Sequence, residues 1–334
     1  MIQIDGSYLE GGGQIIRTAV GLSAVTGKPC RIFRIRKGRP NPGLKAQHLK
    51  GIEAVGKLCN AEIRGLEMGS EELEFIPGKL AFEDMKIDVG TAGSVTLVLQ
   101  SLMIPLVHTD KELEIEITGG THVKWSPVAD YFENVFCYLL KGMGLEIYPE
   151  IVKPGFFPKG GGILKVRIKP GKLKPLRLVD RGDFEGTSGY CYSSNDLKNA
   201  DVATRIFKGT GLELDERNAF YLDSFSTGCS ILLVSNFGNT RIGSSFLGER
   251  GMPAEKVGER TKETLLKQKD SGACLDEWMG DQILPYMALA GDSEVSVSRL
   301  TNHARTNIWT IEKFLDAKFT TQRRSNCVFI KCLI

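Results

Sequence analysis

The chain lacks the features that would place it in a membrane or stabilise it through metal or disulfide bonds. Its N-terminus has no apolar signal core, and its most apolar stretch, residues 94–107, is interrupted by Gln100 and Ser101 and is too short to cross a bilayer. The eight cysteines form no CxxC pair, and a chain of 334 residues needs no disulfide framework. We therefore expect a soluble, cytoplasmic protein without membrane contact, whose cysteines are buried free thiols.

Acidic residues are absent from one long window, residues 11–51, in a chain that holds 40 carboxylates. The net charge of +3 is too small to mark the whole surface as a nucleic-acid binder, so any basic footprint must be local. Arginine side chains suit a phosphate monoester, which favours contact with phosphate or RNA here. A strand edge guarded by basic side chains is the alternative. The basic residues of the window are Arg17, Lys28, Arg31, Arg34, Arg36, Lys37, Arg39, Lys45 and Lys50, with Gln47 and His48 beside them.

Three segments repeat one pattern, in which small residues open a run of helical periodicity. They begin near residues 11 (GGGQIIRTAVGLSAVTG), 92 (AGSVTLVLQSLMIPLV) and 277 (EWMGDQILPYMALAG). A second helical pattern follows each of them, near residues 43, 127 and 303, and a strand-like stretch comes next. The sequence thus predicts three α/β units, although helix pairs that coincide by chance are the alternative.

The spacing of these units indicates an insertion. The gap between the second and third openings exceeds the first gap by about 100 residues, the size of a small domain. The added segment has its own helical run over 195–209, the strand-like CSILLVSNF and a long helix ending TKETLLKQKD. We predict a large three-unit α/β (α+β) domain over residues 1–180 and 274–334, and a small inserted α/β domain over residues 181–273.

The segment EGGGQIIR, residues 10–17, is a glycine-rich turn that enters a helix. Backbone N–H groups and the helix dipole in such a turn can bind an anion, and an ordinary structural turn is as compatible with the pattern. The segment is no P-loop, because the Lys-Ser/Thr ending is missing, and it lacks the GxGxxG spacing of dinucleotide sites. Glu10 could carry a magnesium ion whose other ligands are phosphate oxygens.

Only four histidines are present, and each can be weighed. His108 ends an apolar helix, and His122 follows two glycines, which favours a role in a turn. His48 lies in the basic window and is a candidate substrate contact. Asn302 or His303 begins an amphipathic helix, where a neutral imidazole can attack an activated phosphorus, although helix capping or packing is the simpler interpretation. Asp281 could orient a nearby imidazole, and Trp278 could stack on a base or pack in the core.

These motifs together resemble the RNA 3′-terminal phosphate cyclase family. The resemblance covers essentially the whole chain, most loosely in the insert. It rests on the segments DGSYLEGGGQIIR, IRKGRPNPGLKAQHL, GTAGSVTLVLQ, ADYF, GFFPKGGG, GDQILPYMALAG and HARTNIWTIEKFL. The resemblance implies three tandem βαβαββ-type units with a small inserted α/β domain. It also implies a ligase-type enzyme that uses ATP and a divalent metal, Mg²⁺ or Mn²⁺. The implied reaction converts an RNA 3′-phosphate to a 2′,3′-cyclic phosphate through histidine–AMP and RNA(3′)pp(5′)A intermediates.

The resemblance also assigns roles to individual residues. His303 matches the position of the family's nucleophile, and Glu10 matches its metal-binding glutamate. Trp278 is a bulky residue for a position in the nucleotide pocket. The implied ATP contacts are Gln100, Pro127, Trp278, Met279, Gly280, Asp281 and Gln282. The implied RNA-phosphate contacts are Arg17, Arg39 and Gln47, and His48 beside them is the substrate contact suggested by the basic window.

Two other functions are compatible with this architecture. A non-catalytic relative could serve as a ribosome-assembly binding protein, because fold alone does not establish activity. A small-molecule transferase is the second alternative, since a related repeat architecture occurs in enolpyruvyl transferases. His303, Glu10, Asp281 and the basic window favour the enzyme that acts on RNA. The sequence does not indicate an oligomeric state.

Overall fold

Three units with one topology build most of the protein in the computed structural model, which describes residues 1–334. Each unit runs strand, helix, strand, helix and then two strands, and its first two strands pair in parallel. The sheet orders are β1-β2-β4-β3, β5-β6-β8-β7 and β9-β14-β16-β15, which place corresponding strands in the same positions. The predicted fold class, with βαβαββ units, is confirmed.

The elements of the three units have the following bounds. The first unit holds β1 (Ile2–Asp5), α1 (Gly13–Thr26), β2 (Cys30–Phe33), α2 (Ala46–Leu58), β3 (Glu62–Arg64) and β4 (Leu73–Ile76). The second holds β5 (Met85–Asp88), α3 (Val95–Leu106), β6 (Leu113–Gly119), α4 (Ala129–Tyr131), a π-helical turn (Phe132–Phe136), α5 (Cys137–Gly142), β7 (Ile147–Lys153) and β8 (Gly162–Ile168). The third holds β9 (Arg177–Leu178), α8 (Met279–Gln282), α9 (Leu284–Ala290), β14 (Ser293–Val297), α10 (Asn302–Phe314), β15 (Lys318–Arg324) and β16 (Cys327–Leu333).

The ends of the helices follow from their local sequence. The Ser94 side chain caps α3 by accepting a hydrogen bond from the Leu97 N–H (3.2 Å), and Gly27 closes α1 with φ = 68°, which glycine adopts without steric cost. The third opening helix, expected to be continuous, divides into α8 and α9 at Ile283. Pro285 explains the division, because it has no N–H to extend the hydrogen bonding of α8.

A fourth sheet lies between β9 and α8 in the chain, inside the segment predicted to be an insert. Its order is β11-β10-β12-β13, and 14 buried residues form a separate hydrophobic core. Helices α6 and α7 pack together so closely that a Cβ on Gly209 would collide with the Glu255 carbonyl. Its elements are β10 (Phe184–Ser194), a 3₁₀ helix (Asn195–Ala200), α6 (Val202–Thr210), β11 (Glu216–Leu222), β12 (Cys229–Phe237), β13 (Thr240–Leu247) and α7 (Ala254–Asp270). The exact boundaries of the two domains stay a prediction.

One predicted helix in this segment is wrong. The run 195–209 was expected to be a single helix, but Asp201 adopts φ = 49° and separates the 3₁₀ helix from α6. Aspartate tolerates this left-handed conformation, and a left-handed residue stops helical propagation.

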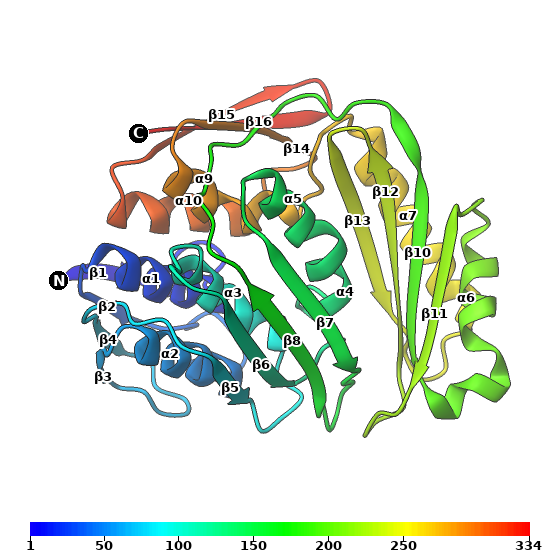
Figure 1. Ribbon diagram of the computed structural model, residues 1–334, viewed down its shortest axis with the longest axis horizontal. Helices are drawn as coiled ribbons and strands as arrows, with labels where there is room; N and C mark the ends of the chain where they lie inside the picture. Colours follow the sequence, from blue (N-terminus) through cyan, green and yellow to red (C-terminus); the bar gives the residue numbers. More distant parts are fainter.

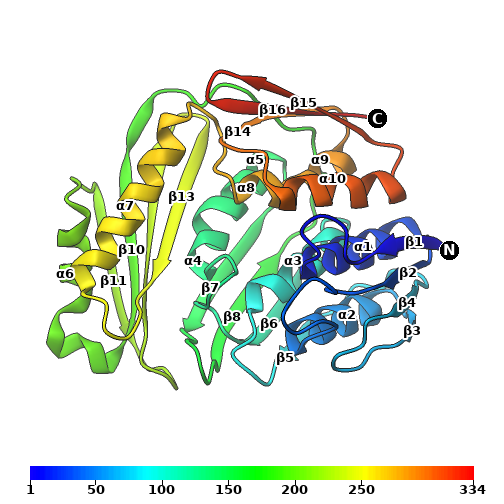
Figure 2. The same cartoon turned by 180° about the vertical axis from the view of Figure 1, so that it is seen from behind.

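The helices of the three units meet in the middle of the molecule. Helix α1 packs against α2, α3 and α10, and a shared hydrophobic core of 65 buried residues joins the units. Figures 1 and 2 show the third unit above the first two, with the fourth sheet at one end of the molecule. None of the helices combines the length and hydrophobicity needed to span a bilayer. Seven cysteines are buried free thiols, as the sequence predicted, whereas the free thiol of Cys327 is partly exposed.

Candidate active site

His303 lies in the first turn of α10. Thr301 caps this helix by accepting a hydrogen bond from the Ala304 N–H (3.0 Å), so the helix begins at Asn302 as expected. The imidazole is 45% exposed, and its two nitrogens have different neighbours. Its Nδ1 lies 2.8 Å from Gln14 Oε1 of α1, and its Nε2 lies 3.6 Å from Glu10 Oε1.

The Gln14 amide determines which nitrogen of His303 carries the proton. Gln14 Nε2 donates to Asp281 Oδ2 (3.2 Å), which leaves Oε1 to face His303. An amide oxygen only accepts hydrogen bonds, so Nδ1 of the neutral imidazole must be the protonated nitrogen. Nε2 then bears the lone pair, and it is the potential nucleophile. Gln14 was not among the residues predicted from the sequence, although it lies three residues before Arg17 on the same face of α1.

Asp281 acts on His303 only through Gln14. Its carboxylate accepts a hydrogen bond from Gln14, and its backbone carbonyl accepts one from Asn307 Nδ2 (2.8 Å). The Oδ1 of Asn307 in turn accepts from the Thr18 hydroxyl (2.6 Å). Burial raises the pKa of Asp281 to about 7, against the opposing effect of Arg17. The predicted orienting role of Asp281 would thus act on the imidazole through the Gln14 amide.

The glycine-rich turn brings Glu10 and Arg39 to the same place. Gly11 adopts φ = 54°, and Arg39 forms an ion pair with the Glu10 carboxylate and also bonds its carbonyl oxygen (3.2 Å). A Cβ on Gly12 would lie 3.4 Å from Arg39 and 3.8 Å from His303 Cε1. The bare backbone of Gly12 thus leaves the turn open beside these side chains.

Glu10 fits a metal ion only as one ligand among several. No cluster of three or more His, Cys, Asp or Glu side chains in the chain could hold a metal ion. A divalent metal at Glu10 would therefore need most of its ligands from phosphate oxygens and water, which is the usual coordination of Mg²⁺ at nucleotide sites.

The pKa of His303 depends on the charges of this turn. Burial lowers the pKa of the imidazole, Glu10 opposes that effect, and the cations Arg17 and Arg39 lower the pKa further. Burial is the largest of these effects. Because the net effect lowers its pKa, the His303 imidazole is neutral at pH 7.

The side chains of Arg17 from α1 and His48 from α2 both approach Gly13 at the start of α1. A Cβ on Gly13 would collide with His48 Nε2 and would lie 3.2 Å from Arg17, so glycine is required for the two side chains to approach the turn. Burial lowers the pKa of Arg17 to about 10, which leaves it cationic at neutral pH. The His48 ring is buried, its Nδ1 accepts from the Lys45 N–H (3.1 Å), and burial together with nearby cations lowers its pKa to about 3.

The residues expected to contact ATP divide into exposed and buried groups. Gln100 Nε2 donates to Gln282 Oε1 (2.8 Å), Gln282 Nε2 donates to the Trp278 carbonyl (2.9 Å), and the Trp278 side chain is 38% exposed. Met279 is fully buried, and Gly280 packs against the neighbouring strand β14, so these two residues lie on the buried side of α8. Contact of these two residues with ATP stays a prediction, and only their backbone atoms could make it.

Gln47 and Pro127 flank the start of α3. Gln47 Oε1 accepts from the Ser94 N–H (2.9 Å), and the Pro127 carbonyl accepts from the Thr96 hydroxyl (2.6 Å). Contacts among the predicted residues thus run along the N-terminal ends of α1, α2, α3, α8 and α10. Helix N-termini favour anions, so this region is electrostatically suited to phosphate groups.

A buried carboxylate, absent from the sequence predictions, anchors α8 to the fourth sheet. Asp276 accepts from Tyr131 Oη (2.7 Å), from the Gly243 N–H of β13 (3.0 Å) and from the N–H groups of Trp278 (3.1 Å) and Met279 (2.9 Å). Burial raises the pKa of Asp276 to about 6. Asp276 therefore links β13 of the fourth sheet to the start of α8, where residues predicted to contact ATP lie.

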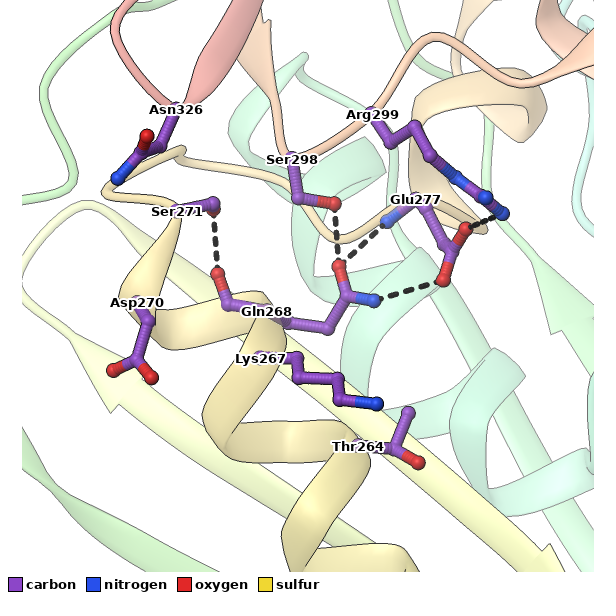
Figure 3. Close-up of a pocket in the computed structure, with 9 residues that line it drawn as sticks. All are labelled: Thr264, Lys267, Gln268, Asp270, Ser271, Glu277, Ser298, Arg299 and Asn326. Carbon is purple, nitrogen blue, oxygen red and sulfur yellow. Dashed lines mark hydrogen bonds and ion pairs between the residues drawn. The ribbon is translucent and has the colours of Figure 1, made fainter.

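Gln268, near the end of α7, makes a second connection, drawn in Figure 3. Its Oε1 accepts from the Glu277 N–H (3.1 Å) and from the Ser298 hydroxyl, and its Nε2 donates to Glu277 Oε1 (3.0 Å). Arg299 closes the network with an ion pair to Glu277. This network lines a polar cavity of about 560 Å³, and it joins the segment before α8 to the loop before α10.

The fold and the site define a three-repeat α/β protein whose helix N-termini gather one accessible histidine with arginines and carboxylates. The sequence profile described as RNA 3′-terminal phosphate cyclase matches residues 8–321. A relative of that name from Methanosarcina barkeri is 43% identical over 97% of this chain and 97% of its own length. One from Methanopyrus kandleri is also 43% identical, over 94% of this chain and 93% of its own length. One from Pyrococcus abyssi is 42% identical over 96% of this chain and 94% of the relative. The chain belongs to the RNA 3′-terminal phosphate cyclase family.

A solved structure of EPSP synthase from Acinetobacter baumannii is 13% identical and aligns with a TM-score of 0.30 over 96% of this chain and 62% of that one. A score of this size supports no conclusion about function.

Proposed function

We propose that this protein uses ATP to convert an RNA 3′-terminal phosphate to a 2′,3′-cyclic phosphate, through a covalent adenylate on His303. One observation carries the proposal. His303 is half exposed, its Nδ1 proton is directed to Gln14, and its Nε2 lone pair faces the turn that holds Glu10 and Arg39. Relatives at 42–43% identity named RNA 3′-terminal phosphate cyclase support the choice of RNA as substrate.

The first step is the adenylylation of His303. Nε2 attacks the α-phosphorus of ATP, the new P–N bond forms, and the bond to the leaving pyrophosphate breaks. The Nδ1 proton stays on the ring, where Gln14 orients it and stabilises the positive charge that develops. Arg17, Arg39 and the N-terminus of α1 stabilise the negative charge on the phosphates.

The next two steps transfer and release AMP. An oxygen of the RNA 3′-phosphate attacks the phosphorus on His303, which breaks the P–N bond and gives RNA(3′)pp(5′)A with neutral imidazole. The adjacent ribose 2′-OH, which DNA lacks, then attacks the 3′-phosphorus, loses its proton and expels AMP. This step is intramolecular, so correct positioning supplies much of the rate.

A divalent cation, Mg²⁺ or Mn²⁺, would be held by Glu10 and would neutralise charge on the phosphate oxygens. The Glu10 carboxylate pairs with Arg39 through Oε1 in the structure, so its second oxygen is the one that would be offered to the metal.

The test measures the first step alone. The protein is incubated with ATP labelled at the α-phosphate and with Mg²⁺ or Mn²⁺, and the modified peptide is mapped by mass. We expect label on His303 in the unaltered protein and in His108→Ala, a control that removes an exposed histidine at the end of α3, and none in His303→Ala. Absence of label on the unaltered protein would favour the non-catalytic binding function.

A second arm of the test identifies the substrate class. RNA oligomers that end in a 3′-phosphate are compared with the same oligomers that end in a hydroxyl. We expect cyclic phosphate and AMP only from the phosphate-terminated RNA. Labelled protein that never transfers AMP to RNA would point to a transferase of small molecules.

A further inference from the structure

Three loops carry large aromatic side chains that face solvent. The loop 120–128 after β6 holds Trp125, the loop 154–161 between β7 and β8 holds Phe157, and the loop 223–228 between β11 and β12 holds Phe225. Trp125, Phe157 and Phe225 are 95%, 76% and 59% exposed, respectively. Apolar rings at such exposure contribute nothing to the core, and exposed aromatic clusters mark binding surfaces.

Hydrogen bonds join these three loops side by side, and we name the surface that they form the aromatic loop surface. The N–H groups of Thr121 and His122 both donate to the Gly155 carbonyl (3.0 and 3.1 Å), which joins the first two loops. The Lys159 N–H donates to Ser226 Oγ (3.1 Å), which joins the second loop to the third. In Figure 1 the β7–β8 and β11–β12 loops lie at the lower end of the molecule.

The backbone at Trp125 gives a further sign that this surface is functional. Trp125 adopts φ = 62°, a left-handed conformation that bulky side chains rarely take. Its exposed ring gains no packing that would offset the conformational cost. Strained residues that stability does not explain concentrate at binding sites.

Cations accompany the aromatic rings. Lys153 Nζ lies 3.5 Å from the centroid of the Phe225 ring, and Lys124 pairs with Glu249 (2.9 Å). Lys159, next to Phe157 in the same loop, is exposed and takes part in no ion pair. Aromatic rings interleaved with lysines bind single-stranded nucleic acid, since every base offers a face for stacking.

The aromatic loop surface is continuous with the candidate active site. A Cβ on Gly160 would lie 2.8 Å from Ala92 Cα, so the second loop packs directly on the turn that opens α3. The same turn leads to Ser94, whose N–H donates to Gln47. The loop of Phe157 and the Gln47 side chain therefore contact the same turn, the first at Ala92 and the second at Ser94.

We propose that the aromatic loop surface binds the single-stranded RNA segment on the 5′ side of the terminal phosphate. Bases stack on Trp125 and Phe157, and Lys159 contacts a phosphate of the backbone. This inference rests on the proposed function, because it extends the same substrate away from the reacting end. It also gives the inserted segment a role, since Phe225 and Ser226 form one side of the surface.

The experiment compares RNA substrates of two lengths, a 3′-phosphorylated dinucleotide and a 3′-phosphorylated 12-mer. The unaltered protein should show a lower KM for the longer RNA. In Trp125→Ala and Phe157→Ala the ratio of the two KM values should move toward one by about tenfold for each ring, the size of one lost stacking interaction. Tyr148→Ala removes an exposed aromatic side chain at the other end of β7 and should leave the ratio unchanged.

Salt dependence tests the role of Lys159. Lys159→Gln should reduce the slope of log affinity against log salt for the 12-mer by about 0.7, the value for one phosphate contact with a single strand. Adenylylation of His303 without RNA is measured in parallel, so that a failure of the proposed function is seen separately from a failure of this inference.

Three outcomes would overturn the inference. The KM ratio could be the same in the unaltered protein and in both aromatic variants. The variants could lose adenylylation together with RNA binding, which would show a structural role for the loops. The substitutions could abolish self-association and leave RNA affinity unchanged, which would assign the surface to a protein partner.

Discussion

The relay from Asp281 through Gln14 to His303 predicts that Gln14→Leu slows adenylylation while ATP still binds. The substitution removes the 2.8 Å hydrogen bond to Nδ1, so the imidazole can rotate and can place its proton on Nε2, where it blocks attack. A neutral hydrogen bond contributes about 0.5–1.5 kcal/mol, and the freed ring adds a smaller loss of orientation. We therefore expect the single-turnover rate of His303–AMP formation to fall roughly 5- to 30-fold.

Gln14→Leu should also lower the stability of the fold, for a reason separate from its effect on the rate. Asp281 loses the donor that lies 3.2 Å from its Oδ2, so the free energy of unfolding should fall by about 1–3 kcal/mol. Ser23→Ala is the matched control, because it removes a buried hydrogen bond of 2.6 Å on the same helix, to the Lys28 carbonyl. This control should lose about 1 kcal/mol of stability and should adenylylate His303 at the unaltered rate.

Nitrogen-15 NMR of the imidazole reads the tautomer directly. In the unaltered protein the proton of neutral His303 should be on Nδ1, and in Gln14→Leu both tautomers should appear. Adenylylation by folded Gln14→Leu at the unaltered rate, or an unaltered protein with the proton on Nε2, would refute the relay.

Two further substitutions test the electrostatics of the site and the role of the insert. Arg39→Gln should raise the pKa of His303, because Arg39 lowers that pKa directly and also neutralises Glu10. At a given pH less of the imidazole is then neutral, so the acid limb of the adenylylation pH–rate profile should move to higher pH. Gln268→Met removes the amide that joins the segments before α8 and α10, and should raise KM for ATP by about 3- to 10-fold with a smaller change in kcat, as measured by pyrophosphate release.

Each of these substitutions has a control in the same part of the chain. Arg34→Gln breaks an exposed ion pair with Asp5 and should leave the acid limb where it was. An acid limb that stays in place in Arg39→Gln would contradict the charge argument. Leu266→Met alters an exposed position two residues before Gln268 and should not affect KM for ATP. A Gln268→Met protein with unchanged KM and kcat would show that the network is structural only.

Much of the fold could be predicted from the sequence, because repeated units bury their apolar faces through local periodicity. Small residues before a helical pattern recur near residues 11, 92 and 277, and each recurrence is a βαβαββ unit in the structure. The break at Asp201 and the division at Ile283 were missed, since one left-handed residue or one proline interrupts a helix without changing its hydrophobic pattern.

The candidate site was only partly visible in the sequence. His303, Glu10 and Arg39 were each selected as candidates, and the structure brings their side chains together from three separate segments. Burial divides the remaining candidates, since Met279 and the His48 ring belong to the interior whereas Trp278 is accessible. Side-chain burial depends on how the units pack, which a linear pattern does not contain.

The sequence by itself determined the repeat architecture, the inserted segment and the identity of the charged residues near the first helix. The tertiary structure alone decided how these residues act on one another. Gln14 and His303 are 289 positions apart in the chain, and only the packing of α1 against α10 brings the amide to the imidazole. The tautomer of a histidine depends on the partner of its other nitrogen, so the nucleophilic atom of His303 is a property of the folded chain.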